Sequence, residues 1–260
     1  MTEPLRTAHS VANASILRSR RGSSSRRDTT KPPTAVRYAQ TCGVAGLAFA
    51  ALFVIALLLV HRAPALGVPD SAYNAFYRVG DGKVLVTVGL YIVPFAGIAF
   101  LWHISTTRAL IEASGSATSD LPKWMHLAAG VLFIGMLFAG TAASCGVALL
   151  TVFSSAPLPA ASVARALAGV GYGLVFVFGV RAAGVYMMTT TTLMRGTGVM
   201  PRWLSVLSYL AALFLLASTT FHPAIVLVFP GWMTLMSVAL LARGGRSLHG
   251  RSEASESLNG

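Results

Sequence analysis

One long stretch without a charged side chain decides what kind of protein this chain forms. It runs for 40 residues, from Trp203 to Ala242. As a single helix it would be about 60 Å long, twice the roughly 30 Å hydrocarbon layer of a bilayer. We therefore expect two membrane-spanning helices here. The turn should fall at His222-Pro223, because a proline ends helical hydrogen bonding.

Four other apolar segments have the length of a membrane span. The chain is 55% hydrophobic and only 11% charged, with a mean hydropathy of +0.68, so little polar sequence remains for a soluble domain. The sequence predicts an all-α, polytopic membrane protein with six transmembrane helices, at about 42–60, 84–106, 125–153, 165–190, 203–220 and 224–242.

The distribution of Lys and Arg predicts the orientation of these spans, because cytoplasmic segments carry the excess of basic residues. With the N-terminus inside, the cytoplasmic segments hold fifteen basic residues and the outer segments hold four. We therefore expect both termini to be cytoplasmic, with a short tail at 243–260.

Residues 1–41 form a basic segment with eight Lys or Arg and two acidic residues. Its serine run and Pro32-Pro33 favour a disordered cytoplasmic tail. Such a tail suits the anionic lipids of the cytoplasmic leaflet, and it also serves as a topology signal; an organelle transit peptide is a further alternative. The net charge of +12 does not indicate nucleic acid as a partner, because it is concentrated in this tail.

The first outer loop, His61 to Gly82, places Tyr73, Phe76 and Tyr77 at helical spacing after Pro69-Asp70. This pattern predicts a short helix. It either lies in the membrane interface with its aromatic face toward lipid, which is the interpretation we favour, or forms a lid over a ligand.

Arg181 is a candidate ligand-binding residue because it lies deep within the fourth span. A buried arginine is costly unless it is paired or hydrated, and no acidic residue lies within a span to neutralise it. It either bonds to carbonyls and hydroxyls and so fixes helix packing, or binds an anionic solute or lipid headgroup. In the second case the threonine run that follows it would contribute Thr189, Thr190, Thr191 and Thr192.

The remaining reactive side chains show no catalytic pattern. His103 and His126 lie toward the cytoplasmic ends of two spans, which leaves a bis-histidine haem only as a remote alternative. Cys42 and Cys145 are expected at opposite depths, so they cannot form a disulfide within the chain. No metal-ligand spacing, nucleophile motif or phosphate loop occurs, so we expect no enzyme activity, no metal and no cofactor.

Small residues and prolines indicate where helices approach or bend. Four-residue spacings occur at Gly46 and Ala50, Gly140 and Ser144, and Gly169 and Gly173. They favour packing within the chain, with a homodimer face as the alternative. Pro94 and Pro230 are expected to disturb the second and sixth spans.

Three segments carry a family resemblance: Leu90 to Trp102, Leu227 to Leu241, and above all Phe176 to Tyr209, where Arg181 precedes a threonine run and the segment GVMPRWL. They resemble a family of multi-span membrane proteins from bacteria of actinobacterial type. The resemblance implies a bacterial cytoplasmic membrane and supplies no activity, substrate or catalytic residue.

Two functional classes follow from the sequence. The first is a non-enzymatic accessory or scaffold protein of the cytoplasmic membrane, which acts through a homo-oligomer or a membrane protein partner. The second is a small carrier or channel that binds an anionic solute or lipid headgroup at Arg181.

Overall fold

The computed structural model describes residues 33–78, 80–114, 119–197, 200–218 and 224–259, with the side chains of α10 described up to Ala242. These residues are helical apart from their connections. The helices are α2 (Pro33–Val60), α3 (Asp70–Arg78), α4 (Lys83–Thr87), the π-helix η1 (Val88–Ile92), α5 (Val93–Ala113), α6 (Asp120–Phe153), α7 (Ala161–Tyr172), the π-helix η2 (Gly173–Gly179), α8 (Val180–Gly196), α9 (Arg202–Ala217) and α10 (Ala224–Asn259).

Among the described residues, five continuous helical segments are long and apolar enough to cross a membrane: 34–60, 83–113, 120–153, 161–196 and 224–242. The predicted all-helical class and these five segments are confirmed. The remaining predicted span, 203–220, corresponds to α9, whose 16 residues give a helix about 24 Å long.

The predicted span limits follow hydropathy, and the helices extend beyond them. Helix α2 begins at Pro33, so residues 33–41 do not belong to a disordered tail, and that boundary is wrong. Ala35 and Ala39 belong to the hydrophobic core, which explains why the helix continues through a more polar stretch. The predicted tail at 1–32 and the predicted turn at His222-Pro223 lie outside the described residues.

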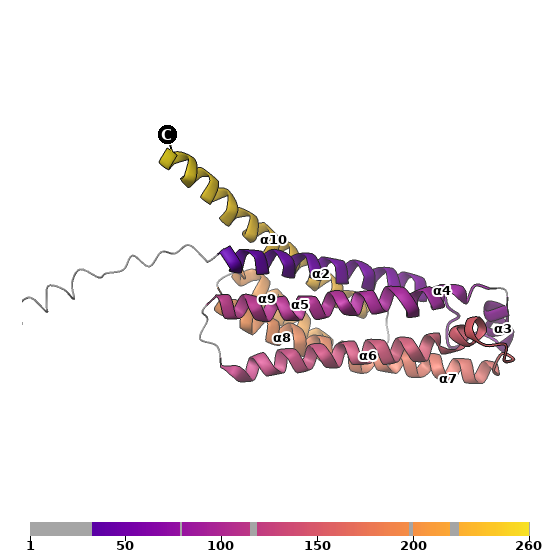
Figure 1. Cartoon of the computed structure of the whole chain (residues 1–260). Helices are drawn as coiled ribbons and strands as arrows, with labels where there is room; N and C mark the ends of the chain where they lie inside the picture. Colours follow the sequence, from indigo (N-terminus) through magenta and orange to yellow (C-terminus); the bar gives the residue numbers. More distant parts are fainter. Residues whose placement is uncertain (1–32, 79, 115–118, 198–199, 219–223, 260) are drawn as a thin grey trace, which may run out of the picture. The chain divides into compact units, whose positions relative to one another are not determined.

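The long helices pack side by side, as Figure 1 shows. Helix α2 packs between α5 and α10, and α6 contacts α5, α7 and α8, while α8 also packs against α9. Buried aromatic side chains fill the space between them. Phe49, Phe100, Phe133 and Phe229 contact one another with ring centroids 4.8 to 6.1 Å apart.

Two π-helical segments interrupt the spans. Segment η1 lies directly before Pro94, whose ring excludes the normal hydrogen bond to the carbonyl of Leu90. The predicted disturbance at Pro94 is therefore confirmed, as a π-helix. Segment η2 separates α7 from α8 without a proline, and such segments are frequent at functional sites.

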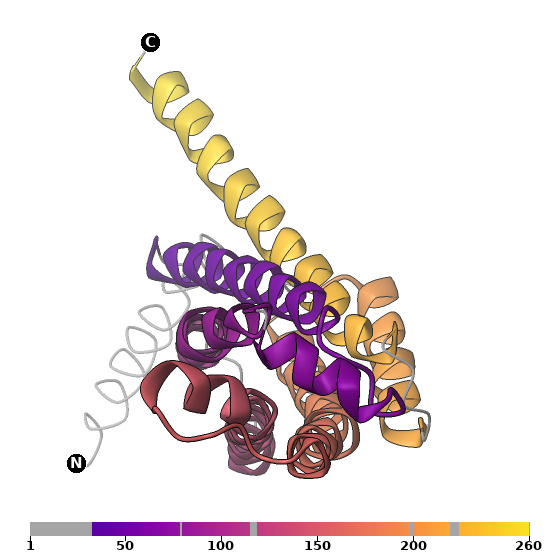
Figure 2. The ribbon, with the colours of Figure 1, turned by 90° about the vertical axis from the view of Figure 1, so that its right-hand side faces the viewer.

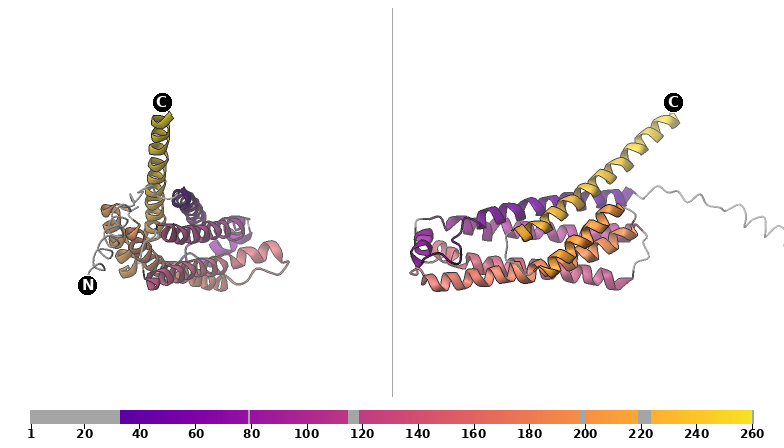
Figure 3. Two further views of the ribbon diagram at one scale, coloured as in Figure 1. Left: turned by 60° about the vertical axis from the view of Figure 1, so that its left-hand side comes forward. Right: turned by 180° about the vertical axis from the view of Figure 1, so that it is seen from behind.

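Helices α9 and α10 pack against each other as a pair, the α9–α10 hairpin, in which α9 is shorter than the five spanning segments. The carbonyl of Ser218, at the end of α9, lies 3.4 Å from the guanidinium of Arg181, close to the middle of the helical segment 161–196. Figures 1 and 3 show α9 and the first part of α10 beside the half of the bundle that lies away from α3. Figure 1 shows α2, α4, α6 and α7 continuing toward α3 beyond this pair.

Candidate functional site

Helix α3 crosses the end of the bundle, as Figure 2 shows from that end. The sequence correctly predicts this helix, but the favoured orientation of its aromatic face toward lipid is wrong. Tyr73 is only 1% exposed and packs with Val147, Ala161 and Ala164 of α6 and α7. Tyr73 is covered by protein, and Phe76 and Tyr77 are half-buried, which favours the alternative interpretation of α3 as a lid.

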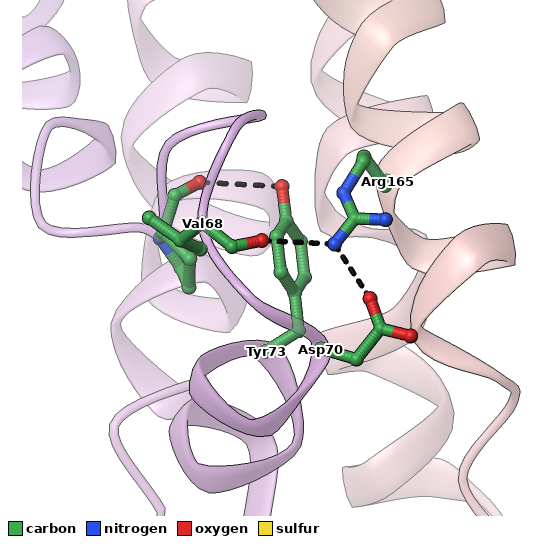
Figure 4. A network of polar contacts seen from close by, with 5 residues as sticks. Val68, Asp70, Tyr73 and Arg165 are labelled. Carbon is green, nitrogen blue, oxygen red and sulfur yellow. Dashed lines mark hydrogen bonds and ion pairs between the residues drawn. The ribbon is translucent and has the colours of Figure 1, made fainter.

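Arg165 of α7 fastens this lid, and Figure 4 shows its contacts. The guanidinium donates hydrogen bonds to Asp70 Oδ1 at 2.7 Å and to the carbonyl of Val68 at 2.9 Å. It also lies 5.0 Å from the centroid of the Tyr73 ring, whose hydroxyl donates to the carbonyl of Pro64 at 3.4 Å. An ion pair, a cation–π contact and the bond to the Val68 carbonyl thus hold α3 and the residues before it against α7.

The same helix covers the thiol of Cys145. Phe76 and Tyr77 pack against Cys145, Leu85 and Ala148, and the cysteine is fully buried. Partial burial of the Tyr77 hydroxyl, together with neighbouring Tyr73 and Cys145, raises the pKa of Tyr77 to about 12. Tyr77 therefore remains neutral at physiological pH and adds no charge to the region.

A partly open cavity of about 60 Å³ lies between the helices near this end of the bundle, and we call it the α3 cavity. Its wall is almost entirely apolar, with a few hydroxyl groups and one thiol. The lining residues are Phe53, Ala56, Leu57, Val60, Val88, Val93, Leu137, Gly140, Thr141, Ser144, Cys145, Gly171, Tyr172, Val175 and Phe176.

The end of the α9–α10 hairpin and the two π-helices, η1 and η2, explain why the cavity lies here. The α9–α10 hairpin does not line the cavity. Leu215 of α9 and Ile225 of α10 line a smaller void instead, which they share with Phe53 and Val175 of the cavity wall. Both π-helices contribute to the wall, through Val88 of η1 and through Val175 and Phe176 of η2. A π-helix widens the local turn, so the wall residues do not close the gap as regular helices would.

Close contact between α6 and α7 forms one side of the cavity. A Cβ added at Gly171 would lie 2.6 Å from the carbonyl oxygen of Gly140 and against the hydroxyl of Ser144. The predicted contact at Gly140 and Ser144 is therefore present. Gly169 and Gly173, by contrast, have no non-local atom within 4 Å of an added Cβ, so their predicted packing within the chain is wrong.

Two hydroxyl groups in the wall are free to bind a ligand. Thr141 and Ser144 have no hydrogen-bond partner among the residues that the structure describes, and both are half-buried. Hydroxyls on the same or neighbouring helices instead donate to a carbonyl three or four residues earlier, as seen for Thr87, Ser105, Thr106, Thr151, Thr189, Thr190, Thr191, Thr192, Ser208 and Thr234. From the sequence, Ser144 is expected only as a packing residue beside Gly140, and nothing in the spacing of Thr141 and Ser144 distinguishes them from these self-satisfied hydroxyls.

Arg181, the main candidate from the sequence, bonds to backbone carbonyls. Its guanidinium donates to the carbonyl of Val177 at 2.7 Å and to that of Ser218 at 3.4 Å. Val177 belongs to the π-helix η2, and Ser218 follows the last residue of α9, where a carbonyl has no helical partner. This geometry supports the interpretation of Arg181 as a residue that fixes helix packing.

The threonine run does not join Arg181 in a common site. Thr189 lies eight residues further along the helix, a rise of about 12 Å. Thr190 and Thr191 are buried, Thr189 is half-buried and Thr192 is exposed. Each hydroxyl donates to a carbonyl of the preceding turn, so the four do not converge on one ligand.

Replacing Arg181 should lower stability without abolishing the fold. Arg181→Met leaves two carbonyls without their donor, which we expect to cost about 1–3 kcal/mol. Arg181→Lys should recover part of the loss, since one ammonium group can reach one of the two carbonyls. Thermal unfolding of the three proteins in detergent tests this order, and a methionine variant as stable as the wild type would contradict the assignment.

A second group of polar side chains is buried where α2, α5, α6, α8 and α10 meet. We call it the polar layer, and its members are Cys42, His103, Thr107, His126, Tyr186, Thr190 and Ser237. His103 Nδ1 lies 3.0 Å from the carbonyl oxygen of Cys42, and the Cys42 thiol lies 3.2 Å from the Thr107 hydroxyl. His103 and His126, predicted at span ends, are therefore core residues.

The hydrogen bonds determine which imidazole nitrogens are free. Because a carbonyl only accepts, His103 Nδ1 carries the proton toward Cys42. Thr190 donates to the carbonyl of Tyr186 at 2.7 Å, so it accepts from His126 Nδ1 at 3.0 Å. Both Nε2 atoms are then unprotonated in the neutral rings, and both are buried without a partner among the described residues, as are the hydroxyls of Tyr186 and Ser237.

The aromatic packing argues against the bis-histidine haem alternative. His126 is stacked on Tyr186 with ring centroids 4.6 Å apart, and Phe100 lies between Tyr186 and His103 at 4.9 Å and 6.3 Å. A haem between the histidines would have to displace these rings. Among the described residues, no group of three or more His, Cys, Asp or Glu could hold a metal ion.

Removing one free hydroxyl of the polar layer should not destabilise the protein. The Tyr186 hydroxyl is buried without a partner, so Tyr186→Phe removes a desolvated polar group and keeps the ring packing. We expect an unchanged or higher melting temperature, with Phe100→Leu as the control that loses ring contacts and stability. A marked loss of stability in Tyr186→Phe would show that the hydroxyl binds a water or a ligand.

Comparisons with known proteins do not name a family for this fold. No family model matches the chain, and neither curated proteins nor solved structures give a match.

Proposed function

We propose that this chain is a non-enzymatic accessory protein of the bacterial cytoplasmic membrane that binds a lipophilic molecule from the bilayer in the α3 cavity. The observation that carries the proposal is the cavity itself, an apolar space with a few polar groups, whose wall includes Cys145, the residue on which Phe76 and Tyr77 of α3 pack. Concave apolar sites with few polar groups are the usual form of small-molecule sites in proteins.

The proposed topology has six membrane passes with both termini in the cytoplasm. The excess of basic residues on the segments assigned to the inside supports this orientation. The α9–α10 hairpin is the short pair of passes, and it returns the chain to the side from which α9 starts. In this orientation α3 and the cavity lie in the outer half of the membrane, where lipid has access to the bundle.

The alternative function, an anion carrier centred on Arg181, has less support. The guanidinium already donates to two carbonyls, and the threonine hydroxyls already donate to the backbone of their own helix. An anion would have to break these bonds before it gained any, whereas a ligand in the α3 cavity breaks none.

Alkylation of Cys145 tests the proposed function, because this thiol lies in the cavity wall beneath α3. A Cys42→Ser background leaves it as the single thiol, since Cys42 and Cys145 are the two cysteines of the chain. The delipidated protein in amphipol should react with N-ethylmaleimide several times faster than the same protein after addition of a bacterial lipid extract. Equal rates with and without lipid would overturn the proposal.

A further inference from the structure

The size of the α3 cavity and its free hydroxyls indicate which class of ligand it prefers. This inference rests on the function proposed above. We propose that the cavity binds the end of a single-chain lipid whose polar group is a neutral oxygen, a hydroxyl or a carbonyl. Thr141 and Ser144 are the residues that hydrogen-bond this oxygen.

The two hydroxyls are placed for a shared ligand. They lie three residues apart on α6, so they project from the same face of that helix, and both line the cavity. A hydroxyl in an apolar wall is stabilised most by a ligand's hydrogen bond when it does not already donate to a backbone carbonyl of its own helix. Among the described residues, neither Thr141 nor Ser144 makes such a backbone bond. One oxygen of a ligand has lone pairs enough to accept from both.

The charges around the cavity exclude an ionised polar group. No lining residue is charged. Arg165 does not line the cavity, and its Nη2 atom donates to Asp70 and to the carbonyl of Val68. A carboxylate or phosphate entering this wall would lose its hydration and find no cation in it, which is more costly than burying a neutral oxygen.

The size of the cavity excludes a ring system. An apolar cavity that binds benzene has a volume of about 150 Å³, and the α3 cavity has about 60 Å³. A narrow chain end fits this space, whereas an aromatic or fused-ring headgroup does not. The rest of the chain extends through the open side of the cavity into the bilayer.

Competition for Cys145 tests the inference with three probes of one chain length. In the Cys42→Ser protein we expect hexadecan-1-ol to slow alkylation at least fivefold, and hexadecane and palmitate to slow it less than twofold. The double variant Thr141→Val with Ser144→Ala should lose the effect of the alcohol. Thr151→Val is the matched control, because the Thr151 hydroxyl donates to the carbonyl of Ala148 at 2.7 Å and does not line the cavity.

The probes separate the failure of this inference from that of the proposed function. Equal protection by hexadecane and hexadecan-1-ol would leave a lipid site but overturn the role of the hydroxyls. Stronger protection by palmitate would overturn the preference for a neutral oxygen. No protection by any probe or by the lipid extract would overturn both proposals. These outcomes are read on the Cys42→Ser protein alone, so they do not depend on the folding of the double variant.

Discussion

Gly171→Val should prevent the stable packing of α6 against α7. An added Cβ at this position lies 2.6 Å from the backbone carbonyl of Gly140 and against the side chain of Ser144. A carbonyl in a helix cannot move aside without shifting the helix, so we expect a loss of about 3 kcal/mol or more. The measurement is the yield of monodisperse protein and its melting temperature in detergent.

Gly169→Val is the matched control for this substitution. It places the same side chain in the same helix two residues earlier, where no non-local atom lies within 4 Å of an added Cβ. Because the change in helix propensity from Gly to Val is similar in both variants, their difference reports the helix contact alone. Similar yields and melting temperatures for the two variants would contradict the packing of α6 and α7 described here.

Tyr73→Ala should release the lid and expose the cavity. Tyr73 is 1% exposed and contacts both α6 and α7, and truncating a buried aromatic side chain typically costs 3–5 kcal/mol. Opening α3 uncovers Cys145, so we expect its alkylation by N-ethylmaleimide in the Cys42→Ser background to accelerate at least tenfold. Each tenfold step in the opening equilibrium corresponds to about 1.4 kcal/mol.

Two milder variants define the contribution of each contact to the lid. Asp70→Asn weakens an ion pair whose carboxylate side chain is 68% exposed, so a small acceleration is expected. Tyr73→Phe removes only the hydroxyl bond to Pro64 and should behave almost as the wild type. If Tyr73→Ala reacts no faster than Tyr73→Phe, then α3 does not cover the thiol and is not a lid.

Apolar runs are enough to predict the spans, because only helices with satisfied backbone groups cross a bilayer. They do not predict the helix ends, since helices such as α2 continue into polar sequence when they still have a neighbour to pack on. The short length of α9 is also invisible in the sequence. The uncharged stretch continues through Ser218, yet the helix ends there.

The candidate site could be predicted only in part. A deep arginine indicates a need for partners, but Arg181 finds them in a carbonyl of η2 and in the end of α9, and neither feature has a recognised sequence pattern. The aromatic spacing of α3 predicts an amphipathic helix and leaves open whether lipid or protein covers Tyr73. The same limit applies to Gly169, Gly171 and Gly173, since spacing alone does not show which glycine faces α6.

The central claim is that the α3 cavity holds a lipophilic molecule, and native mass spectrometry of gently extracted protein tests it most directly. Thr141→Leu is the comparison, because a larger aliphatic side chain at this position occupies part of the cavity and removes one of its hydroxyls. We predict that the wild type retains a stoichiometric single-chain lipid mass and that Thr141→Leu, still folded, loses it. A wild-type chain without any bound mass, or the same mass retained by Thr141→Leu, would contradict the account.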